Sequence, residues 1–112
     1  MVEELRFPAE WFAAGVVTAA SAAEFAKYAR RDPAKRIRYW RWMAFRDFLE
    51  EHTPLDADRC AALFELGRNE EDGALGTAMM CSVLHQPNCP AHVKREAASS
   101  GRDALRRAAV RH

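Results

Sequence analysis

The feature that most constrains this chain is a dense aromatic stretch at residues 35–51, KRIRYWRWMAFRDFLEE. At 3.6 residues per turn its apolar side chains fall on two faces of a helix. One face holds Ile37, Trp40, Ala44 and Phe48, and the other holds Tyr39, Trp42, Met43 and Phe45. A helix that is apolar on two faces needs neighbours on two sides. The stretch therefore predicts a central helix with other helices packed against it.

Turn and capping residues predict two further helices before this stretch. Pro8 suits the first turn of a short helix that ends near Thr18. Ser21 and Glu24 have the spacing of a capping box, which predicts the start of a second helix. Asp32 and Pro33 then predict the cap and first turn of the central helix. The side chains expected to face inward from the two earlier helices are Trp11, Phe12, Val16, Phe25, Tyr28 and Ala29.

The second half of the chain is divided in the same way. After a stop at Pro54, Asp56 can cap a helix that ends at Gly67. Residues 69–72 begin another helix, and Gly73 and Gly76 lie in its first turns. These glycines weaken the helix, so its start either frays or packs closely on a neighbour. Two more helices are expected, separated at residues 99–101. The expected inner positions are Cys60, Leu63, Phe64, Leu75, Met79, Val83, Leu84, Val93, Ala97, Leu105, Ala108 and Ala109. Because no run alternates with a period of two, the prediction is an all-α fold of six to seven short helices.

The breaks recur at a fixed distance. His52-Thr53-Pro54 and His85-Gln86-Pro87 match as His-x-Pro, about 33 residues apart, and the expected caps Ser21, Asp56 and Cys89 are similarly spaced. Regular spacing of this kind predicts helical hairpins that stack and bury their apolar faces on one another. The alternative is an ordinary helical bundle whose helix starts happen to be evenly placed.

The segment 85–112 resembles a unit of the leucine-rich repeat variant and HEAT-like α-solenoid families. The positions that fit are Pro87, Asn88, Pro90, Val93, Leu105, Arg106, Ala109 and Val110. The resemblance covers about a quarter of the chain, and the aromatic stretch departs from it. It implies a curved surface that binds protein or nucleic acid, and it assigns no catalytic residue.

Size and composition narrow the class of protein. A length of 112 residues predicts one domain, residues 1–112. The net charge of +1 gives no overall attraction to nucleic acid or membrane. Three cysteines, an odd number, predict reduced thiols and a cytoplasmic protein, and the Ala- and Arg-rich composition suggests a bacterial gene. Residues 11–23 are too short and too weakly apolar to span a bilayer, so no membrane association is expected.

One cluster has metal-ligand chemistry. Cys81, His85, Cys89 and His92 follow the pattern C-x3-H-x3-C-x2-H, and two Cys with two His can close a tetrahedral zinc site. The alternative is that the thiols pack or cap and the imidazoles are solvated. Cys89 at a helix start would have a lowered pKa and could act as a nucleophile, but nothing orients a base beside it. We therefore predict no catalytic residue, no enzyme and no cofactor, with zinc as the exception to test.

The remaining clue is a segregated charge pattern. Basic residues crowd residues 27–46 and the C-terminal helices, which allows nucleic-acid binding through Arg36, Arg41, Arg106 and Arg107. Aromatic and Arg side chains are also typical anchors of protein interfaces, here Arg38, Tyr39, Arg41 and Trp42. The main prediction is a non-enzymatic, helical-repeat-like adaptor or scaffold that binds another protein or a second copy of itself. The alternatives are a nucleic-acid-binding protein and a small structural zinc protein.

Overall fold

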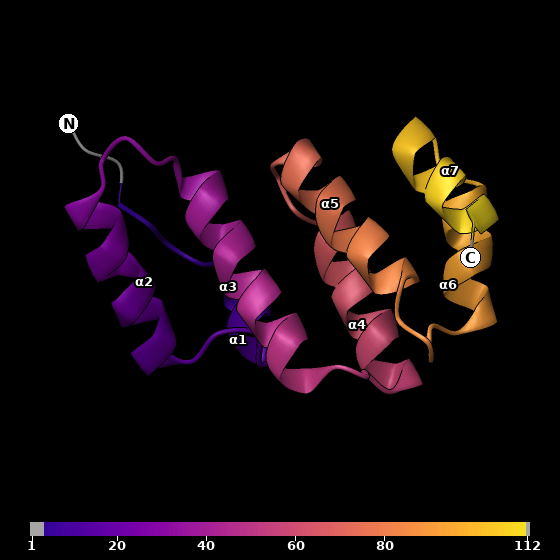
Figure 1. Cartoon of the computed structure of the whole chain (residues 1–112), viewed down its shortest axis with the longest axis horizontal. Coiled ribbons are helices and arrows are strands. Elements are labelled where there is room, and N and C mark those ends of the chain that lie inside the picture. The colour runs from indigo at the N-terminus through magenta and orange to yellow at the C-terminus, as the bar shows by residue number, and fades with distance from the viewer. Residues whose placement is uncertain (1–3, 112) are drawn as a thin grey trace. The chain divides into compact units, whose positions relative to one another are not determined.

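A computed structural model describes residues 4–111, and within this range the chain forms seven helices and no strand (Figure 1). The all-α prediction with six to seven helices is confirmed. The chain divides into two compact units, Met1–Glu51 (unit 1) and His52–His112 (unit 2), and each is described by itself. The single-domain expectation stays a prediction. The helices are α1 (Ala9–Ala13), α2 (Ala19–Arg31), α3 (Ile37–His52), α4 (Ala57–Arg68), α5 (Gly73–Leu84), α6 (Ala91–Ala98) and α7 (Asp103–Arg111).

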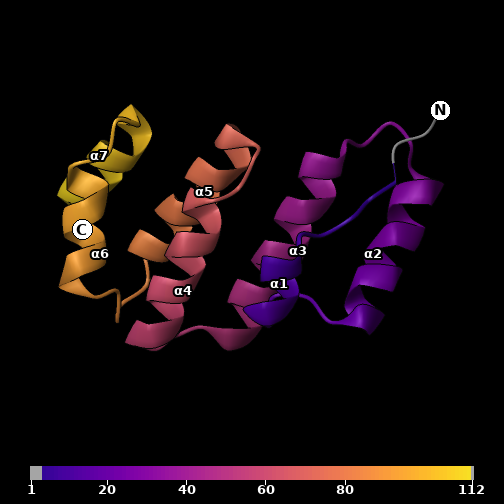
Figure 2. The same cartoon turned by 180° about the vertical axis from the view of Figure 1, so that it is seen from behind.

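In unit 1, α2 and α3 form an antiparallel hairpin, and the N-terminal segment with α1 lies over one face of it (Figures 1 and 2). Trp11 is 1% exposed and packs edge-on against Phe45, with ring centroids 6.4 Å apart. Phe7 reaches both Trp11 and Phe25, at 5.4 and 6.5 Å. These contacts fix the segment to the hairpin. The long aromatic helix predicted at residues 35–51 is α3.

The starts of α2 and α3 differ from the sequence-based expectation. The capping box of α2 is formed by Thr18 and Ser21: the Thr18 hydroxyl accepts a hydrogen bond from the Ser21 amide (3.1 Å), and the Ser21 hydroxyl accepts one from the Thr18 amide (2.9 Å). The Ser21–Glu24 box was wrong because the helix begins earlier, at Ala19, and its cap lies three residues before Ser21. Asp32 ends α2 and does not start α3, since the Lys35 amide donates to its carbonyl in a turn (3.1 Å).

In unit 2, the hairpins α4–α5 and α6–α7 stack through contact between α5 and α7. The predicted Asp56 cap is confirmed, because its carboxylate accepts a hydrogen bond from the Arg59 amide (2.7 Å). Asp72 caps α5 by accepting from the amides of Ala74 and Leu75, both at 3.1 Å. The buried core matches the predicted inner positions, namely Cys60, Leu63, Phe64, Leu75, Met79, Val83, Leu84, Val93, Ala97 and Leu105.

Two glycines let α4 and α5 cross in close contact. Gly67 does not end α4, which continues to Arg68, and Gly67 is itself buried. A Cβ atom on Gly76 would lie 2.4 Å from the Gly67 carbonyl oxygen, and a Cβ on Gly67 would lie 3.0 Å from the Gly76 carbonyl oxygen. The second of the two expectations for Gly76, close packing on a neighbour, is therefore confirmed.

The two His-x-Pro turns lie against each other. The Gln86 side chain accepts a hydrogen bond from the Leu55 amide (3.1 Å) and donates one to the Thr53 hydroxyl (3.2 Å). The Asn88 side chain donates to the Leu55 carbonyl (3.1 Å). Two of these bonds join residues exactly one predicted period apart, 53 with 86 and 55 with 88. The second turn therefore binds the first through side chains in matching positions.

Candidate interaction surfaces

An unbroken series of ring contacts organises unit 1. Adjacent members have centroids between 4.9 and 6.5 Å apart. In order of contact the rings are Trp42, Phe45, Trp11, Phe7, Phe25, Tyr28, Trp40 and Tyr39. Only two of these rings are exposed, Tyr28 at 43% and Tyr39 at 37%. The cluster thus reaches solvent at Tyr28 and Tyr39.

These two tyrosines belong to a surface that also includes Lys35 and Trp40, which we name the aromatic–basic surface. The Trp40 ring contacts both tyrosines, with ring centroids 6.1 Å from Tyr28 and 4.9 Å from Tyr39. The Lys35 ammonium lies 4.5 Å from the centroid of the Tyr39 ring, within the range of a cation–π contact. The Trp40 indole N–H is buried and makes no hydrogen bond within residues 4–111. The surface lies where α2 ends and α3 begins, at the turn of the hairpin (Figure 1).

The residues predicted to bind a protein partner have different environments. Tyr39 belongs to the aromatic–basic surface, and Arg38 is exposed on α3. Trp42 is half-buried and stacks on Phe45 with ring centroids 6.0 Å apart. Arg41 donates from Nε and Nη2 to the Arg6 carbonyl at 3.0 and 2.8 Å, so it anchors the N-terminal segment. Of the four, Tyr39 is the one that the structure joins to the exposed aromatic surface.

The basic residues predicted to bind nucleic acid divide between the units. Arg36 is exposed in unit 1, and its carbonyl accepts hydrogen bonds from the first turn of α3. In unit 2, Arg106 is paired with Asp103 and donates to the Ser100 carbonyl at 2.8 Å, while Arg107 is exposed on α7. Arg41 and Arg106 are thus both engaged in structural contacts, which leaves Arg36 and Arg107 as the more accessible members of the predicted set.

The structure does not assemble the predicted zinc ligands. Cys89 is buried, Cys81 is half-buried with its thiol 3.9 Å from the Ala104 carbonyl, and His85 and His92 are exposed. No group of three or more Cys, His, Asp or Glu side chains within residues 4–111 could hold a metal ion. The residues present therefore do not fit a zinc ion in this conformation.

All three thiols are made less reactive by their surroundings. Burial raises the pKa of Cys60 to about 11, with a smaller contribution from Cys89, and burial also raises the pKa values of Cys81 and Cys89. The expectation of a lowered pKa for Cys89 was wrong. The reason is that Pro90, not Cys89, occupies the N-cap of α6, and the Cys89 side chain is turned into the core. A neutral thiol is a poor nucleophile.

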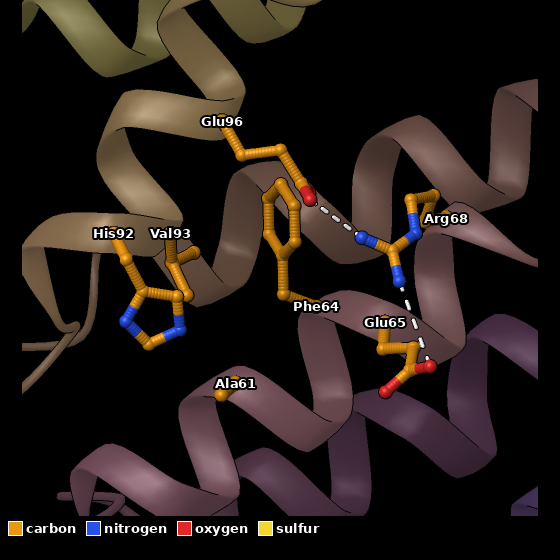
Figure 3. Close-up of a pocket in the computed structure, with 7 residues that line it drawn as sticks. All are labelled: Ala61, Phe64, Glu65, Arg68, His92, Val93 and Glu96. Atoms are coloured by element: carbon orange, nitrogen blue, oxygen red, sulfur yellow. Dashed lines mark hydrogen bonds and ion pairs between the residues drawn. The ribbon is translucent and has the colours of Figure 1, made fainter.

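A small pocket of about 180 Å³ lies between α4 and α6 (Figure 3). Two of the residues that line it, Phe64 and Val93, are almost fully buried. Arg68 lies between two carboxylates, with Nη1 2.5 Å from Glu96 and Nη2 3.5 Å from Glu65. The pocket is smaller than the roughly 300–1,000 Å³ that small-molecule sites usually have. Its charged groups already pair with one another, so we interpret it as a polar seam between the two helices.

Sequence reasoning missed several of these features. Tyr28 and Phe12 were expected to face inward, yet they are 43% and 42% exposed. The Gln86 and Asn88 hydrogen bonds and the Arg68–Glu96 pair were not predicted at all. For the tyrosine, the available signal is the position of Tyr28 between Lys27 and the pair Arg30-Arg31, near the end of a helix.

Protein-family models, curated proteins and solved structures yield no match to this chain. None of the helices within residues 4–111 combines the length and apolar character needed to cross a bilayer.

Proposed function

We propose that this chain is a non-enzymatic α-helical module that binds another protein through the aromatic–basic surface of unit 1. The observation that carries the proposal is the exposure of Tyr28 and Tyr39, which both contact Trp40, together with the Lys35 ammonium over the Tyr39 ring. Tyr, Trp and basic side chains that combine apolar contact with hydrogen bonding are typical anchors of protein interfaces. An aromatic cluster that extends to the surface is an apolar feature for a partner to cover.

The proposed mode of use agrees with the architecture of unit 2. Its stacked hairpins and the side-chain bonds between successive turns support a repeat-like arrangement similar to α-solenoid families. Such arrangements present surfaces for recognition. The three free cysteines support a reducing compartment, and we propose the cytoplasm as the place of action.

Photo-crosslinking tests the proposal, with a photo-reactive amino acid placed at position 39 and the chain expressed in the organism that encodes it. Ultraviolet light should give an adduct that protease destroys and nuclease leaves intact, and Lys35→Glu should reduce its yield. The same label at position 107, on the exposed face of α7, is the control and should give no such adduct. An adduct formed by the purified chain alone identifies the partner as a second copy. Absence of any protein adduct at position 39 refutes the proposed function.

Nucleic acid is the second candidate, because residues 27–46 contain eight Lys or Arg and one Asp, a net charge of 8 − 1 = +7. Counterion release would make such binding strongly dependent on salt. In the same experiment an adduct that nuclease destroys would support this candidate against the first.

A further inference from the structure

We infer that the partner segment recognised by the aromatic–basic surface is an acidic peptide that carries apolar side chains. This inference rests on the proposed function and names the chemistry of the partner. It follows from three properties of the surface: its charge, its exposed aromatic area and the groups that contact its rings.

The charge of the surroundings is strongly one-sided. The whole chain has a net charge of +1, whereas residues 27–46, which contain the surface, carry +7. Lys35 belongs to the surface itself, and three further exposed basic residues come from the end of α2 and the turn before α3, namely Arg30, Arg31 and Arg36. A high local charge of one sign attracts a partner of the other sign and accelerates its association. Glu and Asp carboxylates supply that sign.

The exposed aromatic area of the surface is the reason for expecting apolar side chains in the partner. Tyr28 from α2 and Tyr39 from α3 both contact Trp40, so one aromatic surface spans the two helices. Both tyrosines keep more than a third of their surface in water. An aliphatic or aromatic side chain of the partner would remove that apolar area from water, while charged neighbours bind its backbone and carboxylates. The Trp40 indole N–H, which is buried, makes no hydrogen bond within residues 4–111.

The covering of the rings favours a peptide over single-stranded nucleic acid. Sequence-tolerant binding of single strands depends on bases stacking on open aromatic faces. The Tyr39 ring is contacted by the Lys35 ammonium and by the Trp40 ring, and the Tyr28 ring by those of Phe25 and Trp40. A carboxylate needs no open ring face, because it binds the ammonium and guanidinium groups directly.

Fluorescence anisotropy with the full chain tests the inference. The probe is a labelled peptide of Glu residues interrupted by Phe, compared with a Glu–Ala peptide, a Lys–Phe peptide and an oligo-dT strand of equal charge. We expect the Glu–Phe peptide to bind most tightly, and replacing Phe by Ala to weaken binding about tenfold, as loss of an interface anchor does. The Lys–Phe peptide should not bind.

Charge-reversal variants locate the site. Lys35→Glu should weaken binding of the Glu–Phe peptide at least about tenfold, since it replaces attraction by repulsion. Arg107→Glu in unit 2 makes the same change in net charge and should leave the affinity within about twofold of the parent, because Arg107 is not one of the residues that form the aromatic–basic surface. Circular dichroism checks that both variants are folded. Equal losses in the two variants would overturn the inference, because binding would then follow net charge alone.

The possible failures are distinguishable. If the label at position 39 captures a protein but the Glu–Phe peptide does not bind, the inference fails and the proposed function stands. If oligo-dT binds more tightly than the Glu–Phe peptide and only nuclease-sensitive adducts form, both fail and the nucleic-acid candidate replaces them.

Discussion

The close crossing of α4 and α5 makes a sharp prediction about Gly76→Ala. The new Cβ would lie 2.4 Å from the Gly67 carbonyl oxygen, a distance at which something must shift until at least 3.0 Å is restored. The shift is therefore at least 3.0 − 2.4 = 0.6 Å. Because the obstructing atom belongs to the backbone of α4 at the buried Gly67, a side-chain rotation cannot provide this shift. The two helices have to separate.

The expected loss of stability follows from two opposing effects. Overpacking in a well-packed core costs about 1–3 kcal/mol, and the backbone obstruction puts this case at the upper end of that range. Replacing Gly by Ala in a helix returns about 1 kcal/mol through helix propensity. We therefore expect the free energy of unfolding to fall by about 2 kcal/mol, which corresponds to a melting temperature about 8–16 °C lower for a domain of this size.

Gly73→Ala is the matched control in the same helix. A Cβ at Gly73 meets nothing within 4 Å, and the residue does not have a positive φ. Its replacement should leave stability unchanged or raise it by up to about 1 kcal/mol. Urea unfolding followed by circular dichroism measures both variants. If Gly76→Ala is as stable as Gly73→Ala, the helices are not in the close contact that the structure describes.

The remaining predictions concern contacts elsewhere in the two units. Gln86→Ala should lower the free energy of unfolding by about 1–2 kcal/mol through loss of two hydrogen bonds, with Gln86→Glu, which keeps an acceptor for the Leu55 amide, losing less. Arg41→Ala should release the N-terminal segment and speed tryptic cleavage after Arg6, detected by mass spectrometry. The thiolate absorbance of Cys60, taken as that of the parent minus that of Cys60→Ala, should titrate at about pH 11. The free energy of unfolding should fall as the pH rises from 9 to 11, because the Cys60 thiol ionises at lower pH in the unfolded chain than in the folded one.

Each of these predictions has an outcome that contradicts it. Equal stabilities of the parent and Gln86→Ala would show that the turn contacts contribute nothing. Unchanged cleavage after Arg6 in Arg41→Ala, with Arg107→Ala as the control for lost charge, would show that the segment is held by its aromatic contacts alone. A titration of Cys60 near pH 9 would show that its thiol is solvated.

Local signals in the sequence predicted much of the fold. Asp56 was correctly predicted as a cap, since capping depends only on a short side chain and the next few amides. The inner face of α4 was also predicted, because it depends on helical period alone. Gly67 was interpreted as a helix stop, which is the usual meaning of a glycine after an apolar run. Its actual role depends on Gly76 in the next helix, and no local pattern reports such a pairing.

The candidate surface was predicted only in part. Tyr39 was named as a candidate interface residue, and it is 37% exposed, but Tyr28 was assigned to the core because helical spacing placed it beside Phe25. Helical spacing gives a face and does not say whether anything covers it. No residue of α2 is fully buried, and this could not be known before the packing of unit 1 was known.

The turns show the same distinction between pattern and contact. The match between His52-Thr53-Pro54 and His85-Gln86-Pro87 was recognised from His and Pro. The hydrogen bonds described above between the turns involve neither His nor Pro, since they join the Gln86 side chain to Thr53 and Leu55, and the Asn88 side chain to Leu55. Proline sets the local conformation of each turn, whereas the polar side chain between His and Pro supplies the contact. A search for identical residues therefore finds the period and misses the interaction.

The same comparison shows how far the period of 33 extends. Cys60 and Phe64 of α4 are matched at this offset by Val93 and Ala97 of α6, and all four are buried. Beyond them the offset changes: α5 begins at Gly73, so α7 would begin at 106, yet it begins at Asp103. The difference of three residues arises because α6 has 8 residues against 12 in α4, and begins one residue later than an offset of 33 would place it.

A different contact then positions α7. Helices α4 and α5 are held together by the close contact of Gly67 and Gly76. Before α7, in contrast, Arg102 donates hydrogen bonds to the Gly73 carbonyl (3.2 Å) and the Thr77 hydroxyl (2.8 Å) of α5. Toward the N-terminus the period is also lost, since the cap of α2 is Thr18, which lies 56 − 18 = 38 residues before Asp56. The regular offset is thus a property of the two turns and of the helix that follows each. Unit 1, which holds the aromatic–basic surface, is built on different contacts.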